Sequence, residues 1–262
     1  MNLRHYLDRI GYRGALEPSA AALASLHRAH LLSVPFENLD IPLGHRIELD
    51  RASFYDKIVR RRRGGFCYEL NGLFAWLLEQ VGFRVTLLSG RVYEGARPGP
   101  EFDHMILLVE TEERMIADVG FGDSFIEPLP LGPGEQIQRG VTYRLTGSGV
   151  EPVLERRRAG DRWEPQYAFT LTPRRLEEFA AMCHHQQTSP DSVFTRKSVC
   201  SLATPDGRIT LADGRLIVTS GRDRQERRVE GEGEYRALLK SRFGIDLGGG
   251  ADVSRLVLPP SR

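Results

Sequence analysis

Residues 63 to 82 read Arg63-Gly64-Gly65-Phe66-Cys67-Tyr68-Glu69-Leu70-Asn71-Gly72-Leu73-Phe74-Ala75-Trp76-Leu77-Leu78-Glu79-Gln80-Val81-Gly82. The part from Cys67 to Val81 is rich in Leu, Phe and Trp and predicts a buried helix, which Gly82 is placed to cap. A thiol at a helix N-terminus meets unpaired N–H groups and the positive dipole end, which favour a thiolate. The two glycines allow a sharp backbone path and a close approach by a substrate. The segment predicts a central helix that opens on a candidate nucleophile, with a buried core cysteine as the alternative.

The spacing of apolar residues is typical of helices before this segment and mostly typical of strands after it. Apolar residues recur at helical spacing in residues 3–10 and after Ser19, and a third helix is expected over 50–62. Segments rich in Val, Ile and Leu predict strands at 83–93, 104–110, 114–119, 141–145, 166–171, 193–202, 208–211 and 215–219. We expect an ordered loop at 124–140 and further helices at 172–182 and 234–243. This order predicts an α+β protein with segregated layers.

The composition is that of an ordinary globular protein and argues against several other classes. The 262 residues are 40% hydrophobic and 27% charged, which is enough for a sizeable core. Lys and Arg total 36 against 35 Asp and Glu, so no basic field attracts nucleic acid. The longest apolar runs, such as Leu73–Leu78, are too short to span a membrane, and the N-terminus has no signal-peptide pattern. The odd number of cysteines favours a reducing compartment, and we expect a cytoplasmic protein.

Two polar residues in apolar strand patterns are candidate partners of Cys67. His104 opens one predicted strand, and Asp118 lies between Ala117 and Val119 near the end of the next. A carboxylate in such a place needs a partner, and antiparallel pairing of the two strands would bring Asp118 near His104. A thiol, an imidazole and a carboxylate together make a nucleophile, a base and an orienting group. Their order along the chain leaves open whether the three meet.

The order of these motifs resembles the arylamine N-acetyltransferase family over nearly the whole chain. The matching blocks are Val34-Pro35-Phe36-Glu37-Asn38-Leu39, Arg63 to Asn71, Asp103-His104-Met105, Asp118-Val119-Gly120-Phe121-Gly122, and Thr188-Ser189-Pro190 with Phe194-Thr195 and Ser201-Leu202. The resemblance implies a Cys67, His104 and Asp118 triad in a cysteine-proteinase-like catalytic core. It also implies three domains: a helical bundle over 1–83 carrying the cysteine, an antiparallel β-barrel over 84–190 carrying the histidine and aspartate, and an α/β lid over 191–262.

The same resemblance implies a reaction. Acetyl coenzyme A would be the acyl donor, and arylamines, arylhydrazines or arylhydroxylamines would be the acceptors. His104 would take the thiol proton, and the acetyl group would rest on Cys67 until the amine removes it, in a ping-pong sequence. The backbone N–H of Cys67 is the candidate donor to the oxyanion. No metal is expected.

Further residues are expected around this site. Three aromatic residues and one carboxylate are expected to surround the acceptor, with ordinary core packing as the alternative for the aromatic rings: Phe36, Phe66, Phe121 and Asp103. The resemblance suggests coenzyme A contacts at Gly120, Gly122 and Thr188. Glu37 and Arg63 are expected to pair and support the start of the helix. The chain departs from the family pattern at Cys183 and His185, which leaves the coenzyme contacts there open.

Other functions fit the same motifs. One is an amide synthase that closes a macrocycle in polyketide antibiotic biosynthesis from a thioester-bound chain. Another is a triad thioester hydrolase, which would release free acid without an amine. The non-enzyme alternative is a binding scaffold, and the intact set of three residues argues against it. Assembly into a homo-oligomer is left open.

Overall fold

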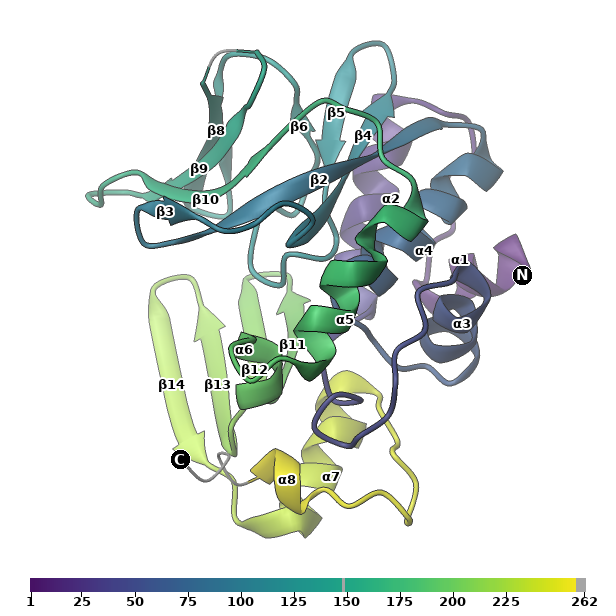
Figure 1. Cartoon of the computed structure of the whole chain (residues 1–262), viewed down its shortest axis with the longest axis vertical. Coiled ribbons are helices and arrows are strands. Elements are labelled where there is room, and N and C mark those ends of the chain that lie inside the picture. Colours follow the sequence, from purple (N-terminus) through teal and green to yellow (C-terminus); the bar gives the residue numbers. More distant parts are fainter. Residues whose placement is uncertain (148, 258–262) are drawn as a thin grey trace.

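The computed structural model describes residues 1–147 and 149–257 and confirms the α+β class. N-terminal helices lie beside a large antiparallel sheet that forms a near-closed barrel, and a smaller sheet with two helices forms the C-terminal part (Figure 1). In these residues we find no helix that combines the length and the apolar character needed to cross a membrane. The domain boundaries at 83/84 and 190/191 stay predictions.

The N-terminal helices surround one buried helix. The elements are α1 (Leu3–Arg9), α2 (Ala20–Ser33), α3 (Arg51–Tyr55), a π-helical turn η1 (Asp56–Arg60) and α4 (Cys67–Val81). The side chains of Ser19 and Asp50 accept hydrogen bonds from the first turns of α2 and α3. Nearly every residue of α4 is buried, and Gly82 ends it in the left-handed conformation at φ 107°. The predicted central helix and its cap are confirmed, whereas the helix expected over 50–62 is α-helical only in its first part.

The larger sheet carries the strands that hold the two other candidate residues. Its strand order is β6-β5-β4-β2-β10-β9-β8-β7 with antiparallel neighbours, and β3 pairs with β2. The strands are β2 (Arg84–Glu94), β3 (Arg97–Pro98), β4 (His104–Glu110), β5 (Arg114–Ala117), β6 (Leu129–Pro130), β7 (Glu135–Gln138), β8 (Val141–Thr146), β9 (Val153–Arg158) and β10 (Glu164–Phe169). The ladder between β4 and β5 ends where Leu107 faces Ala117. The expected antiparallel hairpin is confirmed, and Asp118 is the first residue beyond it.

The smaller sheet joins a short N-terminal strand to a C-terminal meander. Its antiparallel order is β1-β11-β12-β13-β14, formed by β1 (Phe36–Glu37), β11 (Val199–Thr204), β12 (Gly207–Ala212), β13 (Arg215–Ser220) and β14 (Asp223–Arg228). Helices α7 (Gly231–Phe243) and α8 (Ser254–Val257) pack on this sheet through their own apolar core. Because β1 pairs with β11, residues 36–37 lie beside the C-terminal sheet although they belong to the N-terminal segment.

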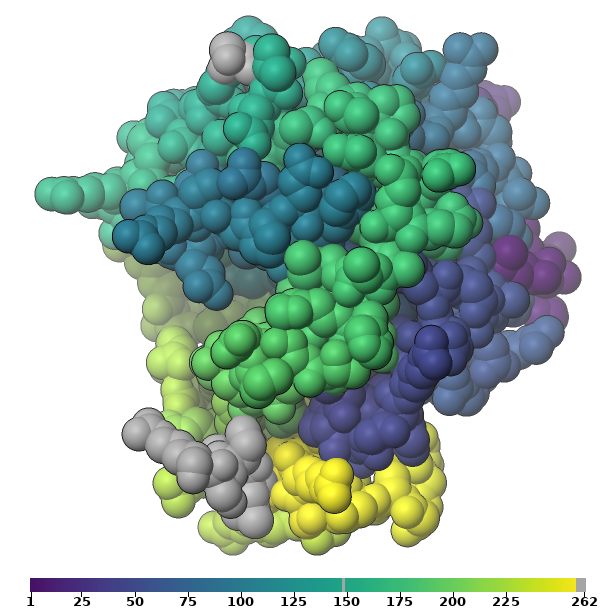
Figure 2. Space-filling model, viewed as in Figure 1, coloured from purple at the N-terminus to yellow at the C-terminus, as the bar shows by residue number. Residues whose placement is uncertain are grey.

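A helical connection crosses the middle of the molecule. It contains a 3-10 turn η2 (Leu176–Phe179), α5 (Ala180–Thr188) and α6 (Val193–Arg196). The expectation of a strand over 193–202 was wrong for its first residues, because Ser192 caps a short helix by accepting from the N–H of Phe194 at 3.1 Å. In Figure 2 this segment (green) lies across the face between the barrel and the C-terminal part.

Candidate active site

The loop before Cys67 is packed so closely that Gly64 and Gly65 have no room for a side chain. A Cβ on Gly64 would lie 1.9 Å from the carbonyl oxygen of Pro35, and one on Gly65 would lie 2.8 Å from the carboxylate of Glu69. The N–H of Glu37 donates to the carbonyl of Gly65 at 2.9 Å. The two glycines therefore pack the loop against residues 35–37 and α4, and neither lines the cavity that contains Cys67.

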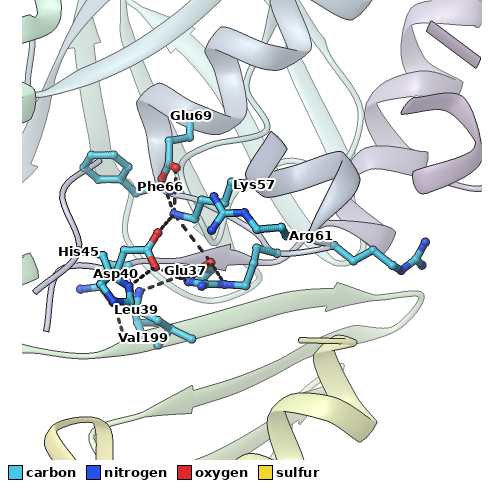
Figure 3. Close-up of polar contacts among 12 residues, drawn as sticks. Glu37, Leu39, Asp40, His45, Lys57, Arg61, Phe66, Glu69 and Val199 are labelled. Atoms are coloured by element: carbon cyan, nitrogen blue, oxygen red, sulfur yellow. Dashed lines mark hydrogen bonds and ion pairs between the residues drawn. The ribbon is translucent and has the colours of Figure 1, made fainter. Parts of the chain in front are cut away.

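A cluster of buried charges lies beneath this loop (Figure 3). Arg63 donates to Glu37 at 2.9 and 3.0 Å and to Asp40 at 3.0 Å. Lys57 Nζ lies 2.9 Å from Glu69 and 2.8 Å from Asp40. All five side chains are buried. Three carboxylates against two cations leave one negative charge in excess, in a region where unpaired charge is costly.

The excess negative charge affects Glu69 most. Burial raises the pKa of Glu69 to about 7, because Lys57 offsets only part of the cost and Glu37 adds repulsion. Burial acts the same way on Asp40, but Lys57 and Arg63 outweigh it and hold the pKa of Asp40 below its usual value. Glu69 also accepts the N–H of Phe66, the residue before Cys67, at 3.1 Å. The cluster therefore fixes the backbone at the start of α4.

The structure joins His104 to Asp118 and places His104 in the same cavity as Cys67. Nε2 of His104 lies 2.8 Å from Oδ2 of Asp118, and both side chains are buried. Nδ1 of the imidazole is therefore the ring nitrogen left to accept a proton from the thiol of Cys67. The hydrogen bonds of the described residues include none between His104 and Sγ of Cys67, and contacts of this kind often tighten only when substrate binds.

Two further donors surround the carboxylate of Asp118. Nδ2 of Asn71 donates to Oδ1 of Asp118 at 2.9 Å, and the N–H of Gly120 donates to the same oxygen at 2.9 Å. The side-chain oxygen of Asn71 accepts the N–H of Val119 at 2.9 Å. Burial raises the pKa of Asp118, but His104 and these donors outweigh it and hold that pKa below its usual value. Asp118 is therefore ionised at neutral pH and orients the imidazole.

The thiol of Cys67 is not activated by its place on the helix alone. Burial raises its pKa well above the usual value, and the charge of Asp103 adds to the effect. Burial therefore opposes the thiolate that the position of Cys67 at the helix N-terminus is expected to favour. Deprotonation of Cys67 needs a base. His104 and His185 both line the same cavity, and His104 is the one bonded to the buried carboxylate of Asp118.

The cavity beside Cys67 has aromatic walls. It encloses about 400 Å³, and its lining includes Phe36, Asp103, Phe121, Gln186 and Phe194. The ring of Phe121 lies 5.3 Å from that of His104, edge to face. Of the residues predicted to surround an acceptor, Phe66 is absent from this lining. Phe66 is instead a fully buried ring that packs against Phe194 at 5.8 Å.

A second cavity lies between the barrel and the C-terminal sheet. It encloses about 440 Å³, and both Phe36 and Phe121 line it as well as the first cavity. Its charged lining comes from widely separated strands and turns: Arg139, Arg158, Arg208 and Arg224, with Asp123 and Asp206. Four arginines against two aspartates leave two positive charges in excess, which suits an anionic ligand.

The residues predicted to contact coenzyme A lie in different places. Gly120 lines the first cavity and Gly122 lines the second. Thr188 lines neither, and its hydroxyl donates to the carbonyl of His184 at 2.8 Å. In the neighbouring stretch Cys183 is buried, with its sulfur 3.3 Å from the amide nitrogen of Gln187.

Comparison with known proteins assigns the chain to a family. A family model described as N-acetyltransferase matches residues 19–253. The chain is 37% identical to the pineal gland arylamine N-acetyltransferase isozyme of Gallus gallus. The alignment is 276 positions long and covers 94% of this chain and 95% of that protein. The chain belongs to the arylamine N-acetyltransferase family. The match spans almost the full length of both proteins, as the sequence motifs predicted.

Solved structures of this family share the fold. The arylamine N-acetyltransferase of Mycobacterium smegmatis superposes with a TM-score of 0.90 at 35% identity, covering 98% of this chain and 99% of that one. The enzyme of Mycobacterium marinum in complex with CoA superposes with a TM-score of 0.88 at 31% identity, covering 97% and 96%. The predicted α+β architecture and the predicted enzyme class are therefore confirmed.

The sequence pattern did not single out Asn71 or Phe194 as site residues. Asn71 carries a recognisable signal, because it lies four residues after Cys67 on the same face of an otherwise apolar helix. A buried amide at that spacing needs partners, and here they are Asp118 and Val119. Phe194 carries no such signal, since it was assigned to a strand and its short helix is set by Ser192.

Glu69 should make stability depend on pH. The folded protein holds the proton of Glu69 more tightly than the unfolded chain, whose usual pKa is 4.5, so this contribution favours folding at low pH and is lost as the pH rises through about 7. The free energy of unfolding of Glu69→Gln minus that of wild type should therefore rise by about 1 to 3 kcal/mol when the pH is raised from about 5 to about 8. Urea unfolding at both pH values measures it. The exposed Glu232→Gln should show no such rise. If the difference between Glu69→Gln and wild type is the same at both pH values, the raised pKa of Glu69 is contradicted.

Gly120 should tolerate no side chain. A Cβ there would lie 2.7 Å from Nδ2 of Asn71 and 2.8 Å from Cα of Cys67, so Gly120→Ala must move Cys67 or the Asp118 loop. We expect acetylation of an aromatic amine to fall about tenfold to a hundredfold, as small misplacements of reacting groups do. The matched control is Gly132→Ala, whose added Cβ meets nothing within 4 Å. Equal rates for the two variants would show that the contact is unimportant.

Proposed function

We propose that this enzyme transfers the acetyl group of acetyl coenzyme A to the nitrogen of arylamines, arylhydrazines or arylhydroxylamines through a thioester on Cys67. The observation that carries the proposal is the placement of Cys67 and His104 on one cavity, with His104 held 2.8 Å from the buried Asp118. A buried thiol beside an oriented imidazole suits nucleophilic catalysis.

The first half-reaction loads the cysteine. Nδ1 of His104 takes the proton from Sγ of Cys67, and the thiolate attacks the carbonyl carbon of the thioester. The tetrahedral intermediate collapses by breaking the carbon–sulfur bond to coenzyme A, whose sulfur receives the proton from the imidazolium. The N–H of Cys67, in the first turn of α4 where helix N–H groups lack helical partners, is our candidate donor to the oxyanion.

The second half-reaction passes the acetyl group to nitrogen. The amine attacks the thioester carbonyl, its proton goes to His104, and Sγ of Cys67 leaves and regains a proton from the imidazolium. The rings of Phe36, Phe121 and Phe194 support the choice of a flat aromatic acceptor, because they offer apolar surface on which an aryl ring packs. The same walls limit the access of water to the thioester.

We place the phosphates of coenzyme A in the arginine-lined cavity. Coenzyme A carries several negative charges, and this cavity has positive charge in excess and shares Phe36 and Phe121 with the cavity of Cys67. Gly122, at φ 92°, lines it and presents backbone with no side chain. In this arrangement the donor and the acceptor reach the sulfur from different cavities.

We also propose that the enzyme works in the cytoplasm. Its three cysteines are unpaired and buried, and Cys67 has to stay reduced to accept an acetyl group.

The loaded enzyme should be directly observable. Incubation with acetyl coenzyme A and no amine should leave one acetyl group on Cys67, which peptide mass spectrometry locates. Addition of an aromatic amine should remove it and yield the amide. Cys67→Ser should form no adduct and no amide while its circular dichroism stays that of wild type. An adduct elsewhere, amide formation by Cys67→Ser, or equal decay of the adduct with and without amine would contradict acyl transfer through this thiol.

The arginine-lined cavity should bind the phosphate-bearing end of acetyl coenzyme A. Replacing Arg158 and Arg224 together by Gln should raise KM for acetyl coenzyme A about threefold to tenfold with little change in kcat, because exposed charge pairs contribute modestly. The control substrate is the acetyl thioester of N-acetylcysteamine, which lacks phosphates and should show no change.

The control variant carries Arg4→Gln and Arg84→Gln, both outside the cavity. An unchanged KM for acetyl coenzyme A in the cavity variant would place the phosphates elsewhere.

A further inference from the structure

His27 is a buried histidine behind the active site that the mechanism does not use. It lies on α2, is fully buried and lines neither cavity. Its Nδ1 lies 2.9 Å from the carbonyl oxygen of Ile126, and its Nε2 lies 3.1 Å from the backbone nitrogen of Asp118. Both ring nitrogens are therefore bonded to one loop of the barrel.

The two partners fix the form of the ring. A carbonyl oxygen only accepts, so Nδ1 carries the proton, and a backbone N–H only donates, so Nε2 offers its lone pair. His27 is therefore neutral in this arrangement. Burial agrees, since it lowers the pKa of His27 to about 4. The ring is stacked on Phe125 at 5.6 Å and lies edge to face with Phe74 at 5.9 Å, which restricts its rotation.

The loop that His27 holds is the one that carries the chemistry. The β4–β5 ladder ends at Ala117, so the N–H of Asp118 has no strand partner and needs an acceptor elsewhere. Ile126 lies at the other end of the same loop. Between the two lie Gly120 and Phe121, which line the cavity of Cys67. His27 therefore ties both ends of the loop 118–126 to α2.

We propose that His27 is a positioning residue, which holds the Asp118 loop so that the carboxylate stays aligned with His104. The inference rests on the triad proposed above. His27 acts through the backbone, whereas Asn71 and Gly120 act on the carboxylate itself. Without an acceptor at Nε2 the N–H of Asp118 is left buried and unpaired, and the loop shifts to find one.

The chain provides a matched control in His30. It lies one turn further on the same face of α2, is fully buried like His27, and also packs against Phe74, at 5.3 Å. Its Nδ1 bonds to the hydroxyl of Tyr6 at 2.9 Å, on the side of α1. Replacing His30 therefore removes a buried imidazole from α2 without touching the loop.

The test compares His27→Leu, His27→Gln and His30→Leu. Leu removes the acceptor, while Gln restores an amide oxygen close to the position of Nε2. The first readout is alkylation of Cys67 by iodoacetamide as a function of pH, with the modified residue located by peptide mass spectrometry. The second is the rate of Cys67 acetylation by acetyl coenzyme A, and melting temperatures are recorded for all variants.

We expect His27→Leu to slow acetylation about tenfold to a hundredfold and to move the alkylation profile to higher pH, because a misaligned imidazole accepts the thiol proton less well. His27→Gln should stay within about threefold of wild type, and His30→Leu within about twofold even if its melting temperature falls.

The proposal is overturned if His27→Leu keeps the wild-type rate and profile, if His30→Leu loses as much as His27→Leu, or if Gln rescues nothing. Alkylation needs neither coenzyme A nor an amine, so a failure of the proposed acetyl transfer would leave this comparison readable.

Discussion

The buried carboxylate of Asp118 is the constraint on which the candidate active site depends. An ionised carboxylate inside a protein persists only when donors replace the water it has lost. Asp118 receives them from three places: His104 at the start of β4, Asn71 in α4, and the N–H of Gly120 in its own loop. The helix and strands that carry these donors share one apolar core, which includes Cys67, Met105 and Ala117. The carboxylate therefore fixes the central helix against the barrel at one point, and the imidazole takes its orientation from that point.

The proposed nucleophile, Cys67, is held by a different set of interactions. Cys67 opens α4, and the buried cluster of Lys57, Arg63 and their carboxylate partners braces the turn before it. The two sets of interactions meet at Gly120, where any Cβ would lie 2.8 Å from Cα of Cys67. The start of α4 and the loop after β5 are therefore in direct contact at this point. Such a contact transmits small shifts instead of absorbing them.

The sequence predicted those parts of the structure that depend on residues close together in the chain. The apolar run from Cys67 and the cap at Gly82 specify α4, and the apolar strands before and after residue 112 specify the β4–β5 hairpin that brings Asp118 to His104. Strands β9 and β14 were missed because charged side chains on both faces hide the alternation. The arginine cavity and the links from Lys57 to Asp40 and Glu69 were missed for another reason. They join residues far apart in the chain, and no local period records which charges will share a buried space.

The raised pKa of Cys67 changes how the reactivity of this site is understood. A thiol that is ionised by a helix dipole alone is nucleophilic at all times, and it is also open to oxidation. Here burial raises the pKa of the thiol, and in the proposed mechanism the thiolate forms as His104 takes its proton. In this proposal the reactivity of Cys67 depends on the alignment of His104. That alignment depends on Asp118, and the loop 118–126 holds Asp118 in place. The same loop contributes Phe121 and lies at the junction of the two cavities. The carboxylate that orients the imidazole and part of the binding surface therefore belong to one short piece of backbone, residues 118–126.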